Sequence, residues 1–296
     1  MSVILEEEGR AVWTGNLPSV AELAALGVTR VGFESQDLSV ETYNQWSATM
    51  AGVDLVPTSG IVEELRAIKE PEELAAIERA VKVSDDAITH IMDTIRPGMT
   101  EREVTWELEV HMRTHGAEAL AFATIAAAGP RSAMSHAVPT DRPIQAGEPM
   151  VIDMGARVDG YLSDITRSFC VGHASDQYLE IWDIVLQAQL AAERGIHAEM
   201  TGIEADALAR SIIYGAGYEG KFGHGLGHGV GLAIHEEPRA SFMATAKLPE
   251  GMVLTVEPGI YLPDWGGIRI EDMIVVGARE SRVLTHAPKM PVVPGR

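Results

Sequence analysis

The sequence predicts an α+β protein whose antiparallel strands collect acidic side chains while amphipathic helices cover the sheet. Three observations predict this fold class. In the main domain, two strand-rich stretches each fold back at a glycine-containing turn, four stretches have helical character, and carboxylates interrupt apolar strand runs. The chain has 296 residues, which suits one large domain with a smaller one, and its 46% of hydrophobic residues allows a sizeable core.

The first 67 residues predict a small α/β domain. Short apolar runs alternate there with polar turns, so strands are expected at 3–5 and 29–33, and helices at 18–26 and 39–50. The main domain is expected to cover residues 68–296.

Two helices of the main domain are predicted from their apolar spacing. One begins at Pro71, because proline at the first helical position loses no hydrogen bond, and Pro97 with Gly98 ends it. The other covers residues 176–194. Its expected apolar face consists of Tyr178, Leu179, Ile181, Trp182, Val185 and Leu186.

Two further helices begin with the same signature. Thr100 with Glu103, and Thr201 with Glu204, have the spacing of a capping box, in which each side chain satisfies a free backbone amide. The two signatures lie about 100 residues apart, and each helix is expected to end near a glycine. This repetition indicates an internal duplication, with coincidence as the alternative.

The remaining segments predict two hairpins. Strands at 149–156 and 161–171 flank Asp159 and Gly160, a strong signal for a two-residue turn. Strands at 251–261 and 268–276 flank a second turn within residues 263–267.

Acidic residues occupy positions in these strands where burial makes them costly. Asp153, Asp164, Glu257 and Glu271 each interrupt or end an apolar run. An ionised carboxylate in a buried strand costs several kcal/mol unless a cation compensates it. Any one of them alone could be an exposed residue on a half-solvated strand, but two hairpins repeat the pattern.

The expected pairing brings these acids together. A turn at Asp159 and Gly160 places Asp153 diagonal to Asp164 on one face, about 7–8 Å apart. A three-residue loop at 264–266 would pair Gly259 with Glu271, so that Glu257 lies diagonal to Glu271. Four carboxylates at this density predict multivalent cations.

A glycine-rich segment supplies histidines near these acids. GHGLGHGVGLAIHEE contains His224, His228 and His235 among five glycines, which let the backbone approach a site closely. We expect one of these histidines to be a metal ligand. His228 and His235 lie seven residues apart, so an ideal strand would direct them to opposite faces, and the spacing does not select between them.

Other chemistries are not supported by the sequence. The glycine-rich segment lacks the Gly-Lys-Ser/Thr ending of a phosphate loop, and neither a His-Glu-x-x-His zinc motif nor a Gly-x-Ser-x-Gly nucleophile elbow occurs. The net charge of −20 argues against nucleic acid and anionic membranes as partners. The single cysteine, Cys170, is expected to be a buried thiol and suits a reducing compartment, and the N-terminus lacks a signal peptide, so we expect a cytoplasmic protein.

Several motifs resemble one known family. VIDMGARVDGYLSDITRSF, GHGLGHGVGLAIHEEP, TVEPGIY and GGIRIED are similar to the signatures of the pita-bread metallopeptidases, in the prolidase and Xaa-Pro aminopeptidase branch. RSAMSHAVP adds a histidine that the family places beside the substrate. The resemblance covers residues 70–278 and implies a pita-bread fold, a pseudo-duplicated antiparallel sheet with helices on its outer face.

The resemblance implies a role for each candidate residue. Asp153 would bind one metal ion, His228 and Glu257 the other, and Asp164 and Glu271 would bridge both. His136 and His235 would contact the substrate and the developing oxyanion. His224 would lie beside the substrate or behind the ligands, and Arg269 would support the carboxylates or bind a substrate carboxylate.

These roles imply a dinuclear peptidase that hydrolyses the bond between an N-terminal residue and proline. Two divalent ions per chain, manganese or cobalt with zinc as an alternative, would provide a bridging hydroxide that attacks the scissile carbonyl. Glu257 would relay the proton to the leaving nitrogen. Short proline-containing peptides are the expected partners, and a homodimer is the expected assembly.

The resemblance also has limits. The family's N-terminal domain is usually longer, so roughly the first third to half of it is expected to be missing here, and dipeptidase and aminopeptidase activities both remain open. Two alternatives are a small-molecule hydrolase or lyase of the same fold and a non-catalytic peptide-binding relative. Creatinase-like hydrolases do not keep this full metal set, and non-catalytic relatives generally lose ligands, whereas all five candidates are present in this sequence.

Overall fold

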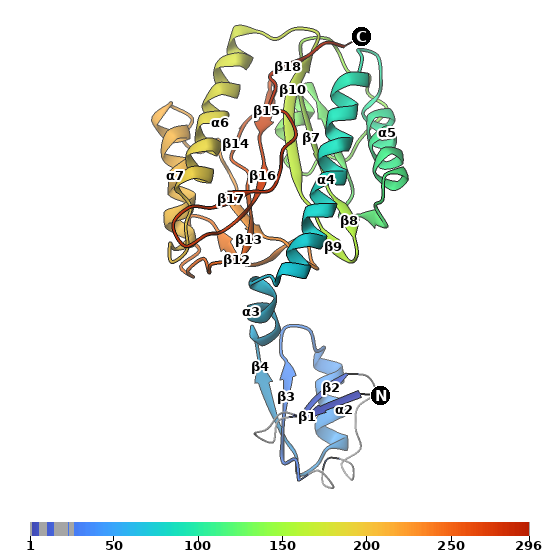
Figure 1. The fold of residues 1–296 in the computed structure, drawn as a ribbon, viewed down its shortest axis with the longest axis vertical. Coiled ribbons are helices and arrows are strands. Elements are labelled where there is room, and N and C mark those ends of the chain that lie inside the picture. Colours follow the sequence, from blue (N-terminus) through green and yellow to red (C-terminus); the bar gives the residue numbers. More distant parts are fainter. Residues whose placement is uncertain (1, 6–10, 15–22, 24–26, 296) are drawn as a thin grey trace. The chain divides into compact units, whose positions relative to one another are not determined.

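The computed structural model describes residues 2–5, 11–14, 23 and 27–295. The chain divides into two compact units, Met1–Leu65 and Arg66–Arg296. Figure 1 traces both units along the chain.

The N-terminal unit contains a parallel β–α–β arrangement, and its elements are β1 (Ser2–Leu5), β2 (Ala11–Thr14), β3 (Arg30–Glu34), α2 (Val40–Thr49) and β4 (Asp54–Thr58). β1 pairs antiparallel with β2, and β3 pairs in parallel with β4. α2 connects the parallel strands and begins at Ser39, whose hydroxyl accepts a hydrogen bond from the Thr42 amide. The expected strands and the helix at 39–50 are therefore confirmed. Of the helix expected at 18–26, only Leu23 is among the described residues.

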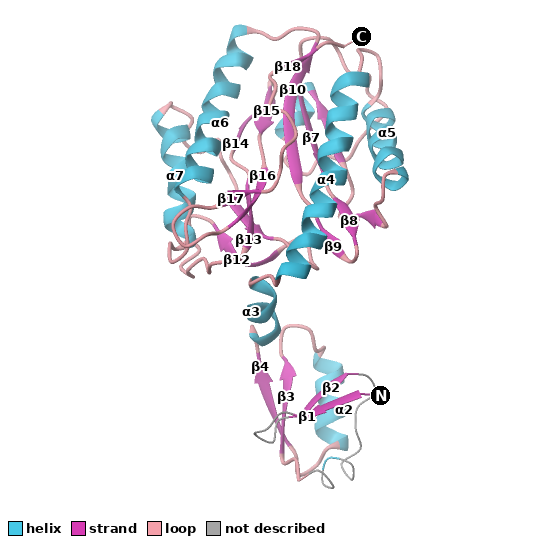
Figure 2. Ribbon diagram, viewed as in Figure 1, coloured by secondary structure: helices cyan, strands magenta, loops and turns pink. Residues whose placement is uncertain are grey.

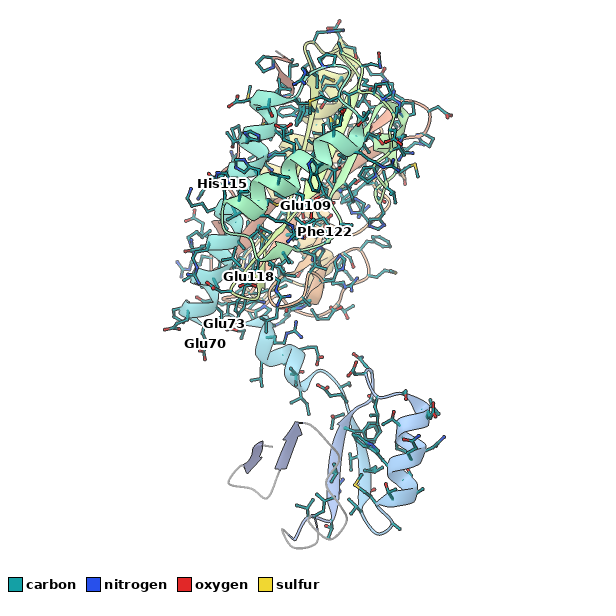
Figure 3. The ribbon with its side chains drawn as sticks, turned by 90° about the vertical axis from the view of Figure 1, so that its right-hand side faces the viewer. Glu70, Glu73, Glu109, His115, Glu118 and Phe122 are labelled. Carbon is teal, nitrogen blue, oxygen red and sulfur yellow. The ribbon has the colours of Figure 1, made fainter. Side chains whose placement is uncertain are left out.

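Short helix α3 (Ile61–Ala67) precedes the four long helices, which are α4 (Pro71–Thr94), α5 (Glu101–Thr114), α6 (Asp176–Gly195) and α7 (Gly202–Gly215). Pro71 is the first residue of α4, as predicted, behind a capping box formed by Glu70 and Glu73 (Figure 3). The capping boxes predicted at Thr100 and Thr201 are both formed. Leu179 was expected on the apolar face of α6 but is 39% exposed, because it lies one helical step off the buried stripe that contains Tyr178 and Ile181.

The strands of the C-terminal unit form several small sheets. The first half contains β5 (Ala119–Leu120), β6 (Ile125–Ala128), β7 (Pro149–Met154), β8 (Ala156–Val158), β9 (Tyr161–Leu162) and β10 (Ile165–Val171). The second half contains β11 (Gly227–Gly229), β12 (Glu236–Ala240), β13 (Val253–Val256), β14 (Gly259–Leu262), β15 (Gly266–Arg269), β16 (Asp272–Val275), β17 (Arg282–Val283) and β18 (Val292–Val293). A four-stranded sheet has the order β18-β10-β7-β6, and a five-stranded sheet has the order β12-β11-β13-β16-β17.

Each half of this unit repeats one layout. The apolar faces of α4 and α5 pack on β6, β7 and β10, whereas those of α6 and α7 pack on β13, β14 and β15. Figures 1 and 2 show the strands gathered between the two helix pairs. The paired capping boxes predicted this duplication, and the α+β class is confirmed.

Two other expectations concern composition. Cys170 is fully buried in the core beneath α6, and burial raises the pKa of its thiol to about 12, so it is a structural residue as expected. None of the helices that the structure describes has the length and the apolar character to cross a membrane.

Candidate metal centre

The first hairpin places two acids on one face. Asp159 and Gly160 both have positive φ, of 51° and 83°, so the predicted two-residue turn and its register are confirmed. The register continues into β7 and β10, where Asp153 lies opposite Thr166. Because side chains alternate along a strand, Asp153, Thr166 and Asp164 share the face that points into the unit.

The second hairpin has a different register from the predicted one. Its loop consists of residues 263–265, so Gly259 pairs with Arg269 instead of Glu271. The neighbouring strands β13 and β16 keep this register, in which Glu257 lies directly opposite Glu271. Because the error is two residues, the alternation of faces is preserved and both acids still point to the same side.

The reason for the error is the role of Gly266. The glycine was expected in the turn, yet it is the first residue of β15 and pairs with Leu262. A Cβ atom at Gly266 would lie 2.9 Å from side-chain atoms of both Pro149 and Ser132. The glycine therefore serves the close crossing of β15 over β7, a contact that the local sequence does not reveal.

The two hairpins meet along β10. The Glu271 amide donates to the Thr166 carbonyl at 3.1 Å, and the Arg269 amide donates to Ser168 Oγ at 2.9 Å. These bonds bring one carboxylate oxygen each of Asp153, Asp164 and Glu271 within 4.8 Å of one another. Three acids distant in sequence thus form one cluster.

The histidines do not lie on a single strand, contrary to the sequence interpretation. His228 is the central residue of β11, the chain then turns, and His235 directly precedes β12. The pairing of β11 with β12 shifts between His228 and Gly229. The two rings pack edge to face with centroids 4.4 Å apart, so both histidines lie at the same place despite their odd spacing.

His228 presents one ring nitrogen to the acids. Its Nε2 lies 3.6 Å from Asp164 Oδ2 and 3.4 Å from Glu257 Oε1. Its Nδ1 lies 3.1 Å from the carbonyl oxygen of Gly229, to which it can donate, and this leaves Nε2 as the free lone pair. Burial lowers the pKa of His228 to about 4, so the ring is neutral near pH 7, as a metal ligand must be.

Thr255 joins His228 to Glu257. Its hydroxyl accepts from the His228 amide at 3.0 Å and donates to Glu257 Oε1 at 3.2 Å. A side chain at Gly227 would collide with the Thr255 carbonyl, so this glycine allows β11 to lie against β13. The sequence interpretation missed Thr255, although its position two residues before Glu257 places both on one face.

The cluster carries more negative charge than its surroundings compensate. Burial, reinforced by the neighbouring carboxylates, raises the pKa of Asp164 and Glu271 well above their usual range. Burial also raises the pKa of Glu257 to about 7. Burial raises the pKa of Asp153 as well, opposed first by Arg269 and more weakly by His136.

These residues fit a site for divalent cations. Asp153 Oδ1 is buried and has no hydrogen-bond partner among the described residues, although buried carboxylate oxygens are normally paired. Arg269 supplies a single positive charge beside several acids. Carboxylate oxygens with one imidazole nitrogen form the hard, mixed donor set that suits manganese, cobalt or zinc. Asp153, Asp164 and Glu271 would hold such an ion on one side, and Asp164, Glu271, His228 and Glu257 would hold a second on the other.

Arg269 supports the acids from behind. It is 3% exposed, and its Nη2 donates to Asp153 Oδ2 at 2.5 Å. Its Nη1 donates to Tyr261 Oη, which lies 2.8 Å from His224 Nε2. Arg269 and His224 were each expected either to support the acids or to contact a substrate. Their hydrogen bonds favour support of the acids. Thr166 completes the arrangement, because its hydroxyl accepts from Arg269 Nε and donates to Glu271 Oε2.

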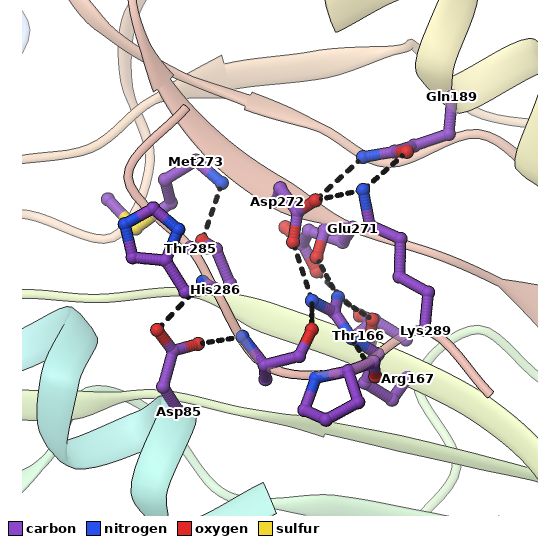
Figure 4. A network of polar contacts seen from close by, with 12 residues as sticks. Asp85, Thr166, Arg167, Gln189, Glu271, Asp272, Met273, Thr285, His286 and Lys289 are labelled. Atoms are coloured by element: carbon purple, nitrogen blue, oxygen red, sulfur yellow. Dashed lines mark hydrogen bonds and ion pairs between the residues drawn. The ribbon is translucent and has the colours of Figure 1, made fainter. Parts of the chain in front are cut away.

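A second buried network lies behind Glu271. Figure 4 shows Arg167, Lys289 and Gln189 gathered around Asp272, the residue that follows Glu271. Arg167 donates to the Glu271 carbonyl at 2.6 Å and to Asp272 Oδ1 at 2.7 Å. The backbone of Glu271 is thereby fixed from the side opposite to its carboxylate. Arg167 and Asp272 lie 105 residues apart in the chain, so no local sequence pattern predicts this contact.

The two remaining predicted residues differ from the acids in being exposed. His136 and His235 are both exposed, and His136 follows the turn Gly129–Ala133 between β6 and β7. Burial lowers the pKa of His235, and the charges of Arg239 and His136 lower it further.

Comparisons with known proteins agree with this geometry. Residues 75–278 match metallopeptidase family M24, and residues 2–68 match the creatinase/prolidase N-terminal domain. The chain is 43% identical to the Bacillus subtilis peptidase YqhT over 97% of its own length and 80% of that protein. It is 45% identical to the Xaa-Pro dipeptidase of Pyrococcus furiosus over 77% of its own length and 66% of that protein.

Solved structures show the same fold. The Xaa-Pro dipeptidase of Bacillus anthracis superposes with a TM-score of 0.90 at 44% identity, covering 92% of this chain and 77% of that one. The X-Pro aminopeptidase of Thermotoga maritima superposes with a TM-score of 0.87 at 38% identity, covering 93% and 78%. The expected pita-bread fold is confirmed, and the chain belongs to metallopeptidase family M24, within its prolidase branch.

Proposed function

We propose that this protein is a dinuclear peptidase that hydrolyses the bond between an N-terminal residue and proline. The observation that carries the proposal is the convergence of Asp153, Asp164, His228, Glu257 and Glu271 from two hairpins and a glycine-rich strand. The printed activities of its relatives, Xaa-Pro dipeptidase and X-Pro aminopeptidase, support the substrate class.

Each ligand would have a defined place. Asp153 would hold one ion, and His228 with Glu257 would hold the other. Asp164 would contact both, since its carboxylate approaches the Asp153 and Glu271 cluster on one side and His228 on the other. Glu271, which also belongs to the three-acid cluster and lies opposite Glu257, would be the second bridging residue.

The residues divide the catalytic work. Two bound divalent ions would supply an activated water at neutral pH and polarise the scissile carbonyl. Glu257 would accept the proton of the attacking water and return it to the leaving nitrogen. The exposed rings of His136 and His235 would donate hydrogen bonds to the substrate and to the oxyanion that develops on it. Arg269 would keep Asp153 ionised and correctly oriented.

A small panel of peptides tests the proposal. The purified protein, reconstituted with manganese, should hydrolyse Ala-Pro, Gly-Pro or Ala-Pro-Ala and should leave Ala-Ala and Met-Ala intact. The ratio of Ala-Pro to Ala-Pro-Ala turnover separates dipeptidase from aminopeptidase activity. Metal analysis of the same sample should approach two equivalents per chain. Equal turnover of Ala-Ala and Ala-Pro, or a metal content near zero, would contradict the proposal.

Finer expectations belong to the same proposal. Manganese or cobalt is proposed as the ion, because oxygen donors with one imidazole suit them, and zinc is the alternative. A cytoplasmic homodimer is proposed as the assembly, supported for the compartment by the single buried cysteine. Reconstitution with each ion separately and the molar mass from light scattering check these two points.

A further inference from the structure

Glu236, the residue after His235, is a buried carboxylate that the proposed chemistry does not use. It accepts hydrogen bonds from Lys69 Nζ at 2.9 Å, from Arg66 Nη2, and from the Ala233 amide at 3.1 Å. The Lys69 side chain is 2% exposed and that of Glu236 is 6% exposed. A buried ion pair of this kind costs desolvation free energy, so a merely stabilising role could be filled as well by apolar side chains.

The carboxylate of Glu236 also fills the space beside the turn that leads to His235. A Cβ atom at Gly231 would lie 2.6 Å from one Glu236 carboxylate oxygen and 2.9 Å from the other. The Gly231 amide donates to the Ala233 carbonyl, and the Gly231 carbonyl accepts from the Leu162 amide at 2.9 Å. The segment 231–236 is thus fixed at two points. Lys69 and Arg66 bind the Glu236 side chain, and the Leu162 amide of β9 binds the Gly231 carbonyl.

His235 is the last residue of the bent segment 231–235 and Glu236 is the first residue of β12, and their side chains have different neighbours. The Glu236 side chain is held by Lys69, two residues before α4, while the His235 ring packs on that of His228 beside the acids. Fixing Glu236 therefore fixes the direction in which His235 points. The interaction spans 167 residues of sequence, from the segment before α4 to β12.

We propose that Lys69 and Glu236 form a positioning pair that sets the His235 ring in the geometry needed for hydrolysis. The proposal rests on the proposed function, in which His235 meets the substrate. Neither residue touches the acids, so the pair acts on the rate of the chemical step rather than on metal binding. A displacement of about 1 Å in a catalytic group can lower a rate on the order of 10²-fold.

The pair is tested with three variants and a matched control. Lys69→Met removes the ammonium but keeps the stem, Glu236→Gln removes the carboxylate charge, and Lys69→Arg keeps the cation. The control is Glu148→Gln, because Glu148 is likewise held by an arginine, Arg142, and by the backbone amide three residues before it, that of Gln145.

The first readout is kinetic. Lys69→Met and Glu236→Gln should lower kcat for Ala-Pro by roughly 10- to 100-fold, with KM and metal equivalents unchanged. Lys69→Arg should restore most of kcat, and Glu148→Gln should leave kcat unchanged although it also loses a part-buried ion pair. If Glu236→Gln does not fold, Lys69→Met carries the test, because Arg66 still pairs with Glu236. A wild-type kcat in Lys69→Met would overturn the proposal.

The second readout does not depend on activity. In the metal-free protein, hydrogen exchange at the Leu162 amide should accelerate at least tenfold in Lys69→Met and Glu236→Gln, and not in Glu148→Gln. Unchanged protection of this amide would overturn the proposal even if the wild-type protein proves inactive on proline peptides. If the two variants lose protection of the Leu162 amide and the wild-type protein does not hydrolyse Xaa-Pro peptides, the pair still anchors segment 231–236. That outcome contradicts the proposed function alone.

Discussion

At the scale of single residues, the histidines of the glycine-rich segment differ in what surrounds their nitrogens. His228 is largely buried, with Nδ1 at the Gly229 carbonyl and Nε2 near two carboxylates. His235 is exposed, and its ring packs edge to face on that of His228. Burial and hydrogen bonding therefore favour His228 as the ligand and leave His235 free to meet a substrate.

This difference predicts opposite phenotypes for two alanine variants. His228→Ala should lose affinity for at least one ion together with activity, because a ligand nitrogen is removed. His235→Ala should keep both ions and its fold, while kcat falls on the order of 10²- to 10³-fold through loss of one transition-state contact. Manganese titration and kinetics on both variants check the assignment. Metal loss in His235→Ala with full metal binding in His228→Ala would reverse it.

At the scale of elements, α4 and α5 meet through a stack of three histidines. The His90 and His111 rings lie 4.5 Å apart, and the His111 and His115 rings lie 3.9 Å apart and nearly parallel. His115 marks the end of α5 in Figure 3. Burial lowers the pKa of His111, and the neighbouring His115 and His90 lower it further, while Asp86 and Glu107 oppose this.

The stack predicts a loss of stability in mild acid. His111 takes up a proton near its ordinary pKa of 6.5 when unfolded but only at lower pH when folded. Between these values the unfolded state binds more protons, so the stabilisation present above pH 6.5 is lost as the pH falls. Urea unfolding from pH 7.5 to 5 should show a shallower decline in His111→Phe than in the wild type. The exposed His173→Gln serves as control, and parallel curves for wild type and His111→Phe would contradict the prediction.

At the scale of the whole C-terminal unit, the acids couple its two halves. Asp153 and Asp164 come from the half covered by α4 and α5, whereas His228, Glu257 and Glu271 come from the half covered by α6 and α7. Without a cation, the carboxylates repel one another across this junction. With a bound cation, the same groups would bind both halves to a common centre.

Glu271→Gln should therefore change stability in opposite directions with and without metal. Metal-free Glu271→Gln should melt roughly 2–4 °C higher than metal-free wild type, because one repelling charge is removed while the Thr166 hydroxyl keeps an acceptor. Saturating manganese should raise the melting temperature of the wild type and have little effect on the variant. Scanning calorimetry of four samples measures both effects. An equal rise in both proteins would place the metal elsewhere.

The sequence by itself determined the features that depend on neighbouring residues. The capping boxes at Thr100 and Thr201 and the turn at Asp159 and Gly160 follow from local backbone physics, and all three formed as predicted. The acids were recognisable because carboxylates in apolar strands need compensation. Alternation along a strand then fixed their shared face, even where the register of the second hairpin was two residues wrong.

Only the tertiary structure decided what depends on contacts between distant segments. The register of the second hairpin follows from the close approach of Gly266 to Pro149. The contact between the rings of His228 and His235 follows from the chain reversal between β11 and β12. The supporting pairs, such as Lys69 with Glu236, join residues far apart in the chain. No local pattern encodes such a contact, because its free energy arises only when the core has brought the two segments together.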